Sequence, residues 1–169
     1  MRKKSDPETF RMETPSPTLD EIDRRILTEL QRNARLTNQE LASRVGVSPS
    51  PCWRRVRALE EAGVIRGYAA LVNPAALGLA VRVFTNVSLE RQEQDQLQVF
   101  EAAVAQWPEV MECYLMTGDA DYLLRVVVAD LAAYERFLMQ KLTRIPGIAS
   151  IKSSFALRSV RYRTDLPVG

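Results

Sequence analysis

The sequence predicts an α+β protein that folds as two domains. Three short helical patterns fill residues 20–62, and from residue 79 onward strand and helix patterns alternate in the order βαββαβ. Asn73-Pro74 separates the two parts, because this pair favours a turn. We therefore expect a disordered leader over residues 1–17, a helical domain over 18–72, a linker over 73–78 and a mixed domain over 79–169.

The first two helices are predicted from their caps and their apolar spacing. Asp20 is the expected cap of the first helix, whose apolar residues recur at helical spacing: Ile22, Ile26, Leu27 and Leu30. Thr37 and Glu40 have the form of a capping box, in which each side chain satisfies a free N–H group near the other. Gly46 is the expected end of this second helix.

The third helix begins in SPSPCWRRVRALEEAGVI, residues 48–65, a stretch that opens with two prolines. If Ser48 is the N-cap, Pro49 and Pro51 fall in the first turn, where N–H groups have no partner inside the helix. Gly63 supplies the stop. At about 100° per residue the helix has an apolar stripe, Cys52, Val56 and Leu59, and an opposite polar side, Ser50, Arg54, Arg57 and Glu61, with Trp53 beside it.

This helix pair has the features of a helix-turn-helix, and residues 64–73 are expected to add a small β-hairpin, or wing, around Arg66-Gly67. Between residues 44 and 66 there are five arginines against two glutamates, a local positive cluster that suits double-stranded DNA. The residues expected to contact bases or phosphates are Arg44, Ser48, Ser50, Trp53, Arg54, Arg55, Arg57 and Arg66. The alternative is that the arginines form a solvated helix face and that Trp53 serves a dimer or linker contact.

The second domain is predicted to be a ferredoxin-like βαββαβ sandwich, so the whole chain combines a winged helix-turn-helix with this sandwich. Strand patterns cover residues 79–89, 110–117, 122–128 and 148–162. Helical spacing links Leu97 to Trp107 and Leu131 to Ile145, and Pro146-Gly147 breaks the second of these helices.

The stretch from Thr117 to Asp121, TGDAD, lies between two predicted strands. Gly118 permits close approach to the backbone, free N–H groups bind carboxylates, and an aspartate binds ammonium groups, so the stretch has the chemistry of a ligand loop. The alternative is a plain hairpin turn, for which Gly-Asp is ordinary chemistry. Asp119 and Asp121 alone are too few for calcium, which takes six to eight oxygens.

The composition argues against several classes of protein. The sequence contains no histidine and no nucleophile–base pair, so we expect no enzyme, no metal site and no cofactor. Its two cysteines, Cys52 and Cys113, are expected to be buried thiols in a reducing compartment. There is neither an apolar run of about 18 residues nor a signal peptide, which favours a cytoplasmic protein without a membrane partner.

From Leu19 to about Val168 the chain resembles the Lrp/AsnC family, the leucine-responsive or feast/famine transcription regulators. The matching stretches are LDEIDRRILTELQRNARLTNQELASRVGVSPSPC, RVRALEEAGVIRGYAALVNP, ECYLMTGDADYLL and LTRIPGI. The leader has no counterpart in the family. The resemblance implies a sequence-specific regulator of amino-acid metabolism genes, similar to the branch that controls amino-acid catabolic operons.

The resemblance also implies an assembly and an effector. Family members form dimers through the sheets of the sandwich, and these assemble into tetramers or octamers. A small amino acid binds between subunits near the G-D-x-D loop. The effector candidates are Thr117, Gly118, Asp119 and Asp121, together with Ser153, Ser154 and Phe155 on the last strand. Two alternatives stay open: an architectural protein that wraps DNA with little sequence preference, and an amino-acid-binding metabolic protein.

Overall fold

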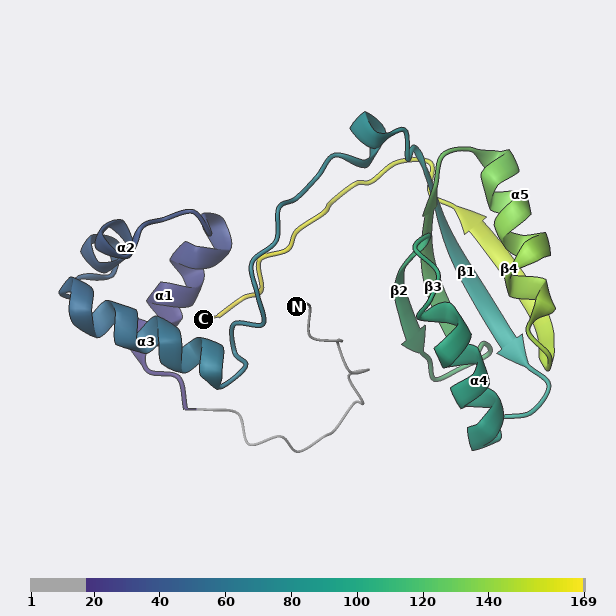
Figure 1. Ribbon diagram of the computed structural model, residues 1–169, viewed down its shortest axis with the longest axis horizontal. Coiled ribbons are helices and arrows are strands. Elements are labelled where there is room, and N and C mark those ends of the chain that lie inside the picture. Colours follow the sequence, from purple (N-terminus) through teal and green to yellow (C-terminus); the bar gives the residue numbers. More distant parts are fainter. Residues whose placement is uncertain (1–17, 169) are drawn as a thin grey trace. The chain divides into compact units, whose positions relative to one another are not determined.

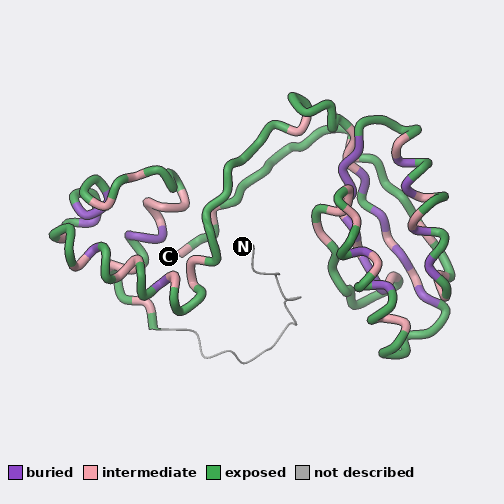
Figure 2. The backbone as a smooth tube through the Cα atoms, viewed as in Figure 1, coloured by how far each residue is buried: buried purple, intermediate pink, exposed green. Residues whose placement is uncertain are grey.

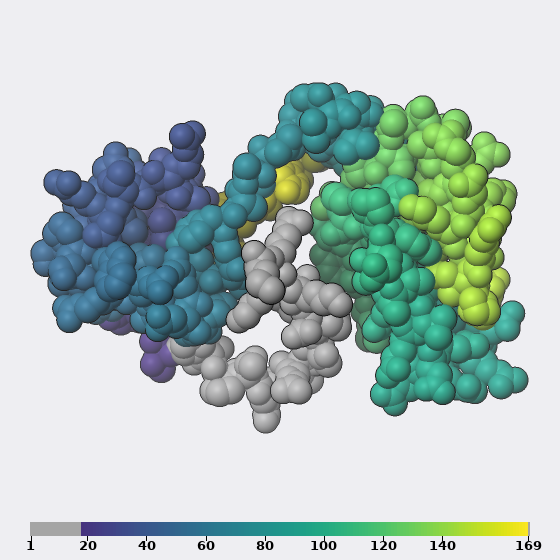
Figure 3. All heavy atoms as spheres, in the orientation of Figure 1, coloured from purple at the N-terminus to yellow at the C-terminus, as the bar shows by residue number. Residues whose placement is uncertain are grey.

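The chain divides into two compact units, whose helices are drawn in Figure 1 and whose atoms are drawn as spheres in Figure 3. The computed structural model describes residues 18–168, so the leader predicted over residues 1–17 lies outside the described residues. Of the described residues, one unit holds 18–70 together with 162–168, and the other holds 71–161. Each unit has its own cluster of buried apolar side chains. Figure 2 marks buried residues in both units in purple.

Three helices build the first unit: α1 (Glu21–Arg32), α2 (Asn38–Val45) and α3 (Pro49–Glu61). The caps predicted for α1 and α2 are confirmed. Asp20 accepts a hydrogen bond from the N–H of Asp23, and Thr37 accepts one from the N–H of Glu40. In both cases the later carboxylate accepts a bond from the N–H of the cap, which completes a capping box.

The start of α3 is where the sequence predicts it. Ser48 has the extended backbone of an N-cap and Pro49 is the first helical residue, although the Ser48 hydroxyl makes no capping bond. Asn38 Nδ2, at the start of α2, donates to the carbonyl of Pro49 at 2.8 Å. This bond fastens the starts of α2 and α3 to each other. Gly63 follows α3 with φ 71°, a backbone conformation that suits glycine.

The three helices bury one apolar core. Its fully or nearly fully buried members are Ile26, Leu27, Leu41, Ala42, Val45, Cys52 and Leu59. Cys52 is fully buried, as its place on the apolar stripe predicts. The core therefore fixes which side of α3 faces inward, and with it which side faces solvent.

Residues 64–73, where the sequence predicts a small hairpin, form no β-strand in this structure. Val64 and Ile65 pack against the helical core instead. Beyond them, Tyr68, Leu71 and Val72 are exposed. A two-stranded hairpin is marginal in water unless it packs against another element. Of residues 64–73, only Val64 and Ile65 pack against the helical core.

The C-terminal segment, residues 162–168, lies along α1 and belongs to the first unit, whereas the sequence predicts it in the second domain. Gln31 holds this segment twice, since its amide donates to the carbonyl of Leu166 at 3.1 Å and accepts from its N–H at 2.6 Å. Arg24 donates to the carbonyl of Val168 at 2.7 Å, and the Val168 side chain packs against the helical core. Such long-range contacts leave no periodic signal in the sequence.

The second unit is a four-stranded antiparallel sheet with the predicted βαββαβ order. Its strands are β1 (Val81–Leu89), β2 (Val110–Leu115), β3 (Tyr122–Val128) and β4 (Ile148–Phe155), arranged β2-β3-β1-β4. Its helices are α4 (Gln94–Val104) and α5 (Leu131–Gln140), and short 3-10 turns cover Pro74–Leu77 (η1) and Leu142–Arg144 (η2). The strand predicted over 148–162 therefore ends seven residues early.

Both long helices of this unit cover the same face of the sheet (Figure 1). Val83, Thr85 and Val87 alternate along β1 on the covered face and are fully buried. Thr85 shares a 2.8 Å hydrogen bond with the hydroxyl of Tyr134 on α5, so no polar atom is stranded there. Phe84, on the other face, is 39% exposed. One face of the sheet is thus left open.

The exposure of Cys113 differs from the prediction. The sequence predicts a buried thiol, whereas Cys113 is exposed. Its strand, β2, is an edge strand, and the strand is exposed at most of its positions. An apolar pattern in the sequence does not reveal which strand will lie at the edge of the sheet.

The capping box of α2 leads to a prediction about pH. Hydrogen bonds from the backbone and then the side chain of Thr37 lower the pKa of Glu40 from its ordinary value of 4.5. A carboxylate whose pKa is depressed by folding stabilises the protein above its unfolded-state pKa and loses that effect as the pH falls through its folded-state pKa. We expect Glu40→Gln to lower the melting temperature at pH 6 and to have little effect near pH 3.

Circular dichroism melts between pH 3 and 7 measure this difference. Glu135→Gln is the matched control, because Glu135 is exposed and makes no ion pair among the described residues. A melting-temperature difference for Glu40→Gln that stays constant across this range would contradict the prediction.

Candidate nucleic-acid interface and effector site

The solvent side of α3 carries Ser50, Trp53, Arg54 and Arg57, all of them exposed. Trp53 is 56% exposed, which is unusual for so large an apolar side chain. The guanidinium of Arg57 lies 5.9 Å from the centre of the Trp53 ring, within the range of a cation–π contact. A flat aromatic surface and guanidinium groups are therefore presented together on one side of the helix.

Arg54 and Arg57 differ in their partners, but neither is tied to the core. Arg54 has no ion pair among the described residues. Arg57 lies 3.4 Å from Glu60 and 3.9 Å from Glu61, both within its own helix. Ion pairs between exposed side chains contribute little free energy, so a phosphate can replace these carboxylates at small cost.

Arg55, one of the predicted DNA contacts, makes two ion pairs within the helical unit. Its Nη1 lies 2.8 Å from Asp23 and 2.6 Å from Asp20, at the start of α1. These hydrogen bonds, to Asp23 first and then to Asp20, raise the pKa of Arg55 above its ordinary value. A backbone bond from Asp23, followed by the Arg55 contact, lowers the pKa of Asp20. Arg55 therefore joins α3 to α1.

The remaining predicted DNA contacts lie around α3. Ser48 and Arg66 are exposed before and after it. Arg44 on α2 pairs with Glu29 on α1 at 3.0 Å, and its side chain is still 53% exposed. The structure thus brings Ser48, Ser50, Trp53, Arg54 and Arg57 together on the first three turns of one helix. Arg44 and Arg66 stand apart from them, on α2 and beyond the end of α3.

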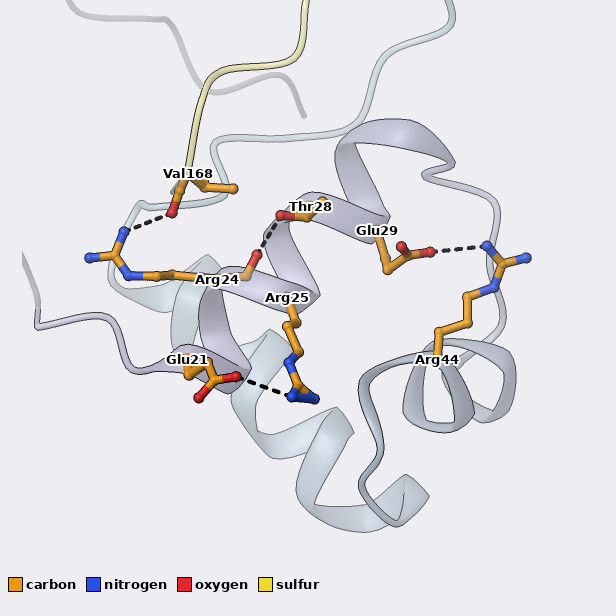
Figure 4. A pocket seen from close by; sticks show the side chains of 7 residues that line it. All are labelled: Glu21, Arg24, Arg25, Thr28, Glu29, Arg44 and Val168. Carbon is orange, nitrogen blue, oxygen red and sulfur yellow. Dashed lines mark hydrogen bonds and ion pairs between the residues drawn. The ribbon is translucent and has the colours of Figure 1, made fainter.

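A hollow of about 300 Å³ lies beside α1 (Figure 4). Its lining residues are Glu21, Arg24, Arg25, Thr28, Glu29, Arg44 and Val168. Figure 4 shows each of its three arginines directed at an acceptor: Arg24 at the Val168 carbonyl, Arg25 at Glu21 and Arg44 at Glu29. Sequence reasoning did not single out Arg24 and Arg25. In the structure they hold the C-terminal segment and the helices in place.

The predicted effector loop lies between β2 and β3 and is exposed from Thr117 to Asp119. Gly118 has φ 126°, a conformation that side chains rarely adopt. In the described part of the chain, the N–H groups of Gly118, Asp119 and Ala120 donate to no protein acceptor. Outward-facing N–H groups in a turn are suited to a carboxylate.

Asp121, the last residue of the loop, is 7% exposed. Its Oδ2 accepts from the N–H of Leu89 at 2.6 Å, and its Oδ1 accepts from Gln92 Nε2 at 2.5 Å. Its own N–H donates to the carbonyl of Val87 at 3.0 Å. The carboxylate thus holds the end of β1 and the loop that follows it, which fits the alternative of a structural turn residue. Sequence reasoning missed Gln92.

The two groups of predicted effector residues do not meet within one chain. Ser153 pairs with Thr85 and Phe155 with Val83, whereas Asp121 is held at Leu89. Thr85 and Val83 lie four and six residues before Leu89, which corresponds to about 13–20 Å along β1. Ser153 is also engaged, because its hydroxyl shares a 2.6 Å hydrogen bond with Tyr134. Ser154, next along β4, pairs with Phe84.

Residues 18–168 contain neither a metal-ligand cluster nor a membrane-spanning helix. No three His, Cys, Asp or Glu side chains gather there as metal ligands would. None of the helices in this range is long and apolar enough to span a membrane.

Comparison with known families identifies both units. Residues 19–66 match the model of a winged helix-turn-helix DNA-binding domain, and residues 82–166 match that of the Lrp/AsnC ligand binding domain. Among curated proteins, the chain is 52% identical to the Bkd operon transcriptional regulator of Pseudomonas aeruginosa over 150 residues, covering 89% of this chain and 98% of that protein. It is 42% identical to the leucine-responsive regulatory protein of Escherichia coli K12, covering 91% and 94%.

Solved structures agree with these matches. A transcriptional regulator from Neisseria meningitidis, solved as its L-Met complex, is 44% identical with a TM-score of 0.85, covering 89% of this chain and 97% of that one. Escherichia coli AsnC is 32% identical with a TM-score of 0.81, covering 87% and 97%. The predicted fold class and the predicted family resemblance are confirmed.

The position of Asp121 leads to a stability prediction. We expect Asp121→Ala to lower the free energy of unfolding of the second unit by about 1–3 kcal/mol, because the buried N–H of Leu89 loses its acceptor. Asp119→Ala is the matched control, since the Asp119 carboxylate accepts no hydrogen bond from the described residues. Urea unfolding followed by circular dichroism compares the two. Equal stability of both variants would show that the Asp121 carboxylate is dispensable for the fold.

Proposed function

Because the chain belongs to the Lrp/AsnC family of transcription regulators, we propose that it binds specific sites on double-stranded DNA through α3 and that a small amino acid changes its assembly there. The family regulates transcription and is not a family of enzymes. The observation that supports the DNA-binding part most directly is the exposed group of Trp53, Arg54 and Arg57 on the second helix of a helix-turn-helix.

In this proposal α3 enters the major groove with its N-terminal turns toward the bases. Arg54 and Arg57 bond guanine or phosphate, for which the planar guanidinium is suited. Trp53 packs against a thymine methyl group or the sugar-phosphate chain, and Ser48 and Ser50 bond phosphates at the helix start. Arg44 and Arg66 add phosphate contacts, whereas Arg55 holds α3 against α1.

The open face of the sheet supports dimer formation. On this face Phe84 is 39% exposed and Tyr114 is 51% exposed, and no helix of the unit covers them. Apolar faces of this kind are usually covered by a partner. We infer that two copies pack through these faces and that the dimers assemble further, to a tetramer or an octamer. The α3 helices of one dimer then reach successive major grooves, about 34–36 Å apart.

The loop between β2 and β3 supports an amino-acid effector. The free N–H groups of Gly118, Asp119 and Ala120 are suited to its carboxylate, and the Asp121 carboxylate is suited to its ammonium group. Ser153, Ser154 and Phe155 lie too far along the sheet to join this loop in the same chain, so in this proposal a neighbouring subunit supplies them. The effector then acts by binding one assembly more tightly than another.

Two relatives suggest the kind of effector and the kind of target genes. The Neisseria meningitidis structure contains L-Met, and the Pseudomonas aeruginosa relative regulates an operon named Bkd. We propose that this chain likewise responds to an apolar or small amino acid and controls amino-acid catabolic genes in the cytoplasm.

The DNA-binding proposal is tested by replacing Arg54 and Arg57 together with Ala. A site selected by the wild-type chain from random DNA serves as the operator. We expect the variant to bind it more weakly, by about 1–3 kcal/mol for each arginine that reads a base, and the salt dependence to fall by about one ion per lost phosphate contact. Fluorescence anisotropy at several salt concentrations measures both quantities.

A matched control removes Arg91 and Arg136, two exposed arginines of the second unit, so that the net charge falls equally. Sedimentation must show the same assembly for all three proteins. Unchanged affinity of the Arg54/Arg57 variant would overturn the role of α3. If the wild-type chain selects no common sequence from random DNA, it is an architectural DNA-wrapping protein instead.

The effector proposal is tested by a thermal-shift screen against the twenty amino acids. A ligand that binds only the folded state stabilises it by about 2.7 kcal/mol at one hundred times its Kd. We expect one or a few L-amino acids to raise the melting temperature and the matching D-amino acids to have no effect. A flat response to all twenty would contradict the proposal.

A further inference from the structure

The Asp121 carboxylate has an unusual set of partners. It is 7% exposed, yet no Lys or Arg of the described chain pairs with it. Its two side-chain contacts are neutral donors, the N–H of Leu89 and the amide of Gln92. Buried carboxylates usually have a cationic partner, because the charge has lost its solvation. The site therefore holds an acceptor for a positive charge that residues 18–168 do not supply.

The two oxygens of Asp121 differ in how easily they can be released. Oδ2 is held by the backbone N–H of Leu89, the last residue of β1, at 2.6 Å. The backbone of Asp121 is fixed as well, because its carbonyl accepts from Met116 and its N–H donates to Val87. Oδ1, in contrast, is held by the side chain of Gln92, an exposed residue in the loop before α4. Only this last bond can open by rotation of a side chain.

We propose that Gln92 is a reversible cap on Asp121 and that the ammonium group of the amino-acid effector replaces its amide at Oδ1. This inference rests on the proposed function of the loop. An ammonium group carries a full positive charge, so its hydrogen bond to a carboxylate is stronger than that of a neutral amide. The amino acid's carboxylate then faces the free N–H groups of Gly118, Asp119 and Ala120, which belong to the same loop.

The cap has a consequence for affinity. A ligand that binds only the uncapped form has an apparent Kd equal to its intrinsic Kd divided by the uncapped fraction. Gln92→Ala leaves Oδ1 permanently uncapped, so the effector should bind more tightly. Gln92→Lys places an ammonium group of the chain itself beside Oδ1, so the effector should bind more weakly. Two substitutions at one position thus act in opposite directions, which a purely structural role for Gln92 does not produce.

The experiment is isothermal titration of the full-length chain with L-methionine, L-leucine and any amino acid found in the thermal-shift screen. We expect Gln92→Ala to lower the Kd by about three- to ten-fold. Gln92→Lys should raise it by at least as much. Gln98→Ala is the matched control, because Gln98 is exposed on α4 and makes no hydrogen bond within the described residues. Its Kd should equal that of the wild type.

The measured Kd values test the Gln92 cap separately from the effector proposal. An equal Kd for Gln92→Ala and wild type overturns the cap while leaving the effector proposal intact. Weaker binding by Gln92→Ala also overturns it, since Gln92 would then be a contact of the ligand. Binding by Gln92→Ala alone supports a cap that is closed in nearly all wild-type molecules. If neither protein binds any of the twenty amino acids, both the effector proposal and the cap are wrong. Melting temperatures confirm that all variants fold.

Discussion

The hydrogen bonds from Arg55 to Asp20 and Asp23 are the contact on which the proposed DNA-binding surface depends. They join the start of α1 to the middle of α3, while Asn38 joins the start of α2 to the start of α3. Together with the buried stripe of α3, these bonds fix the rotation of the helix about its axis. Arg54 and Arg57, on either side of Arg55 in sequence, are therefore held facing solvent. One arginine serves the fold so that its neighbours are available to a ligand.

The second unit contains the opposite case, a buried charge without an ionic partner among the described residues. Arg55 is satisfied by two carboxylates of its own chain, whereas Asp121 is buried with neutral donors alone. Charge that is paired inside the chain contributes to the fold, and charge that lacks a partner is available to a ligand. Under the proposed function, the guanidinium of Arg54, which has no ion pair within residues 18–168, binds a phosphate, and the carboxylate of Asp121 binds an ammonium group.

Much of the fold could be predicted because it depends on local chemistry. Asp20, Thr37 and Gly46 act within one turn of their own helix, and the alternation along β1 and β3 is a property of each strand alone. The conformation of residues 64–73, the tail along α1 and the exposure of Cys113 depend on contacts between distant residues, which periodicity does not record. The candidate site divides likewise: the angle argument places Trp53 and Arg54 outward, but no spacing reveals that Asp23 holds Arg55 or that Gln92 reaches Asp121.

The chain's connectivity bears on how an effector signal is passed to DNA. Residues 71–80 join the first unit to β1, and residues 156–161 join β4 back to the segment held by Gln31 and Arg24. The first unit is therefore connected to the second through the start of β1 and the end of β4, which lie beside each other in the antiparallel sheet. A head attached by one flexible linker can reorient freely, whereas two attachments restrict its orientations. In the proposed assembly, a rearrangement of the sheets between subunits would reach α3 through these two segments of chain.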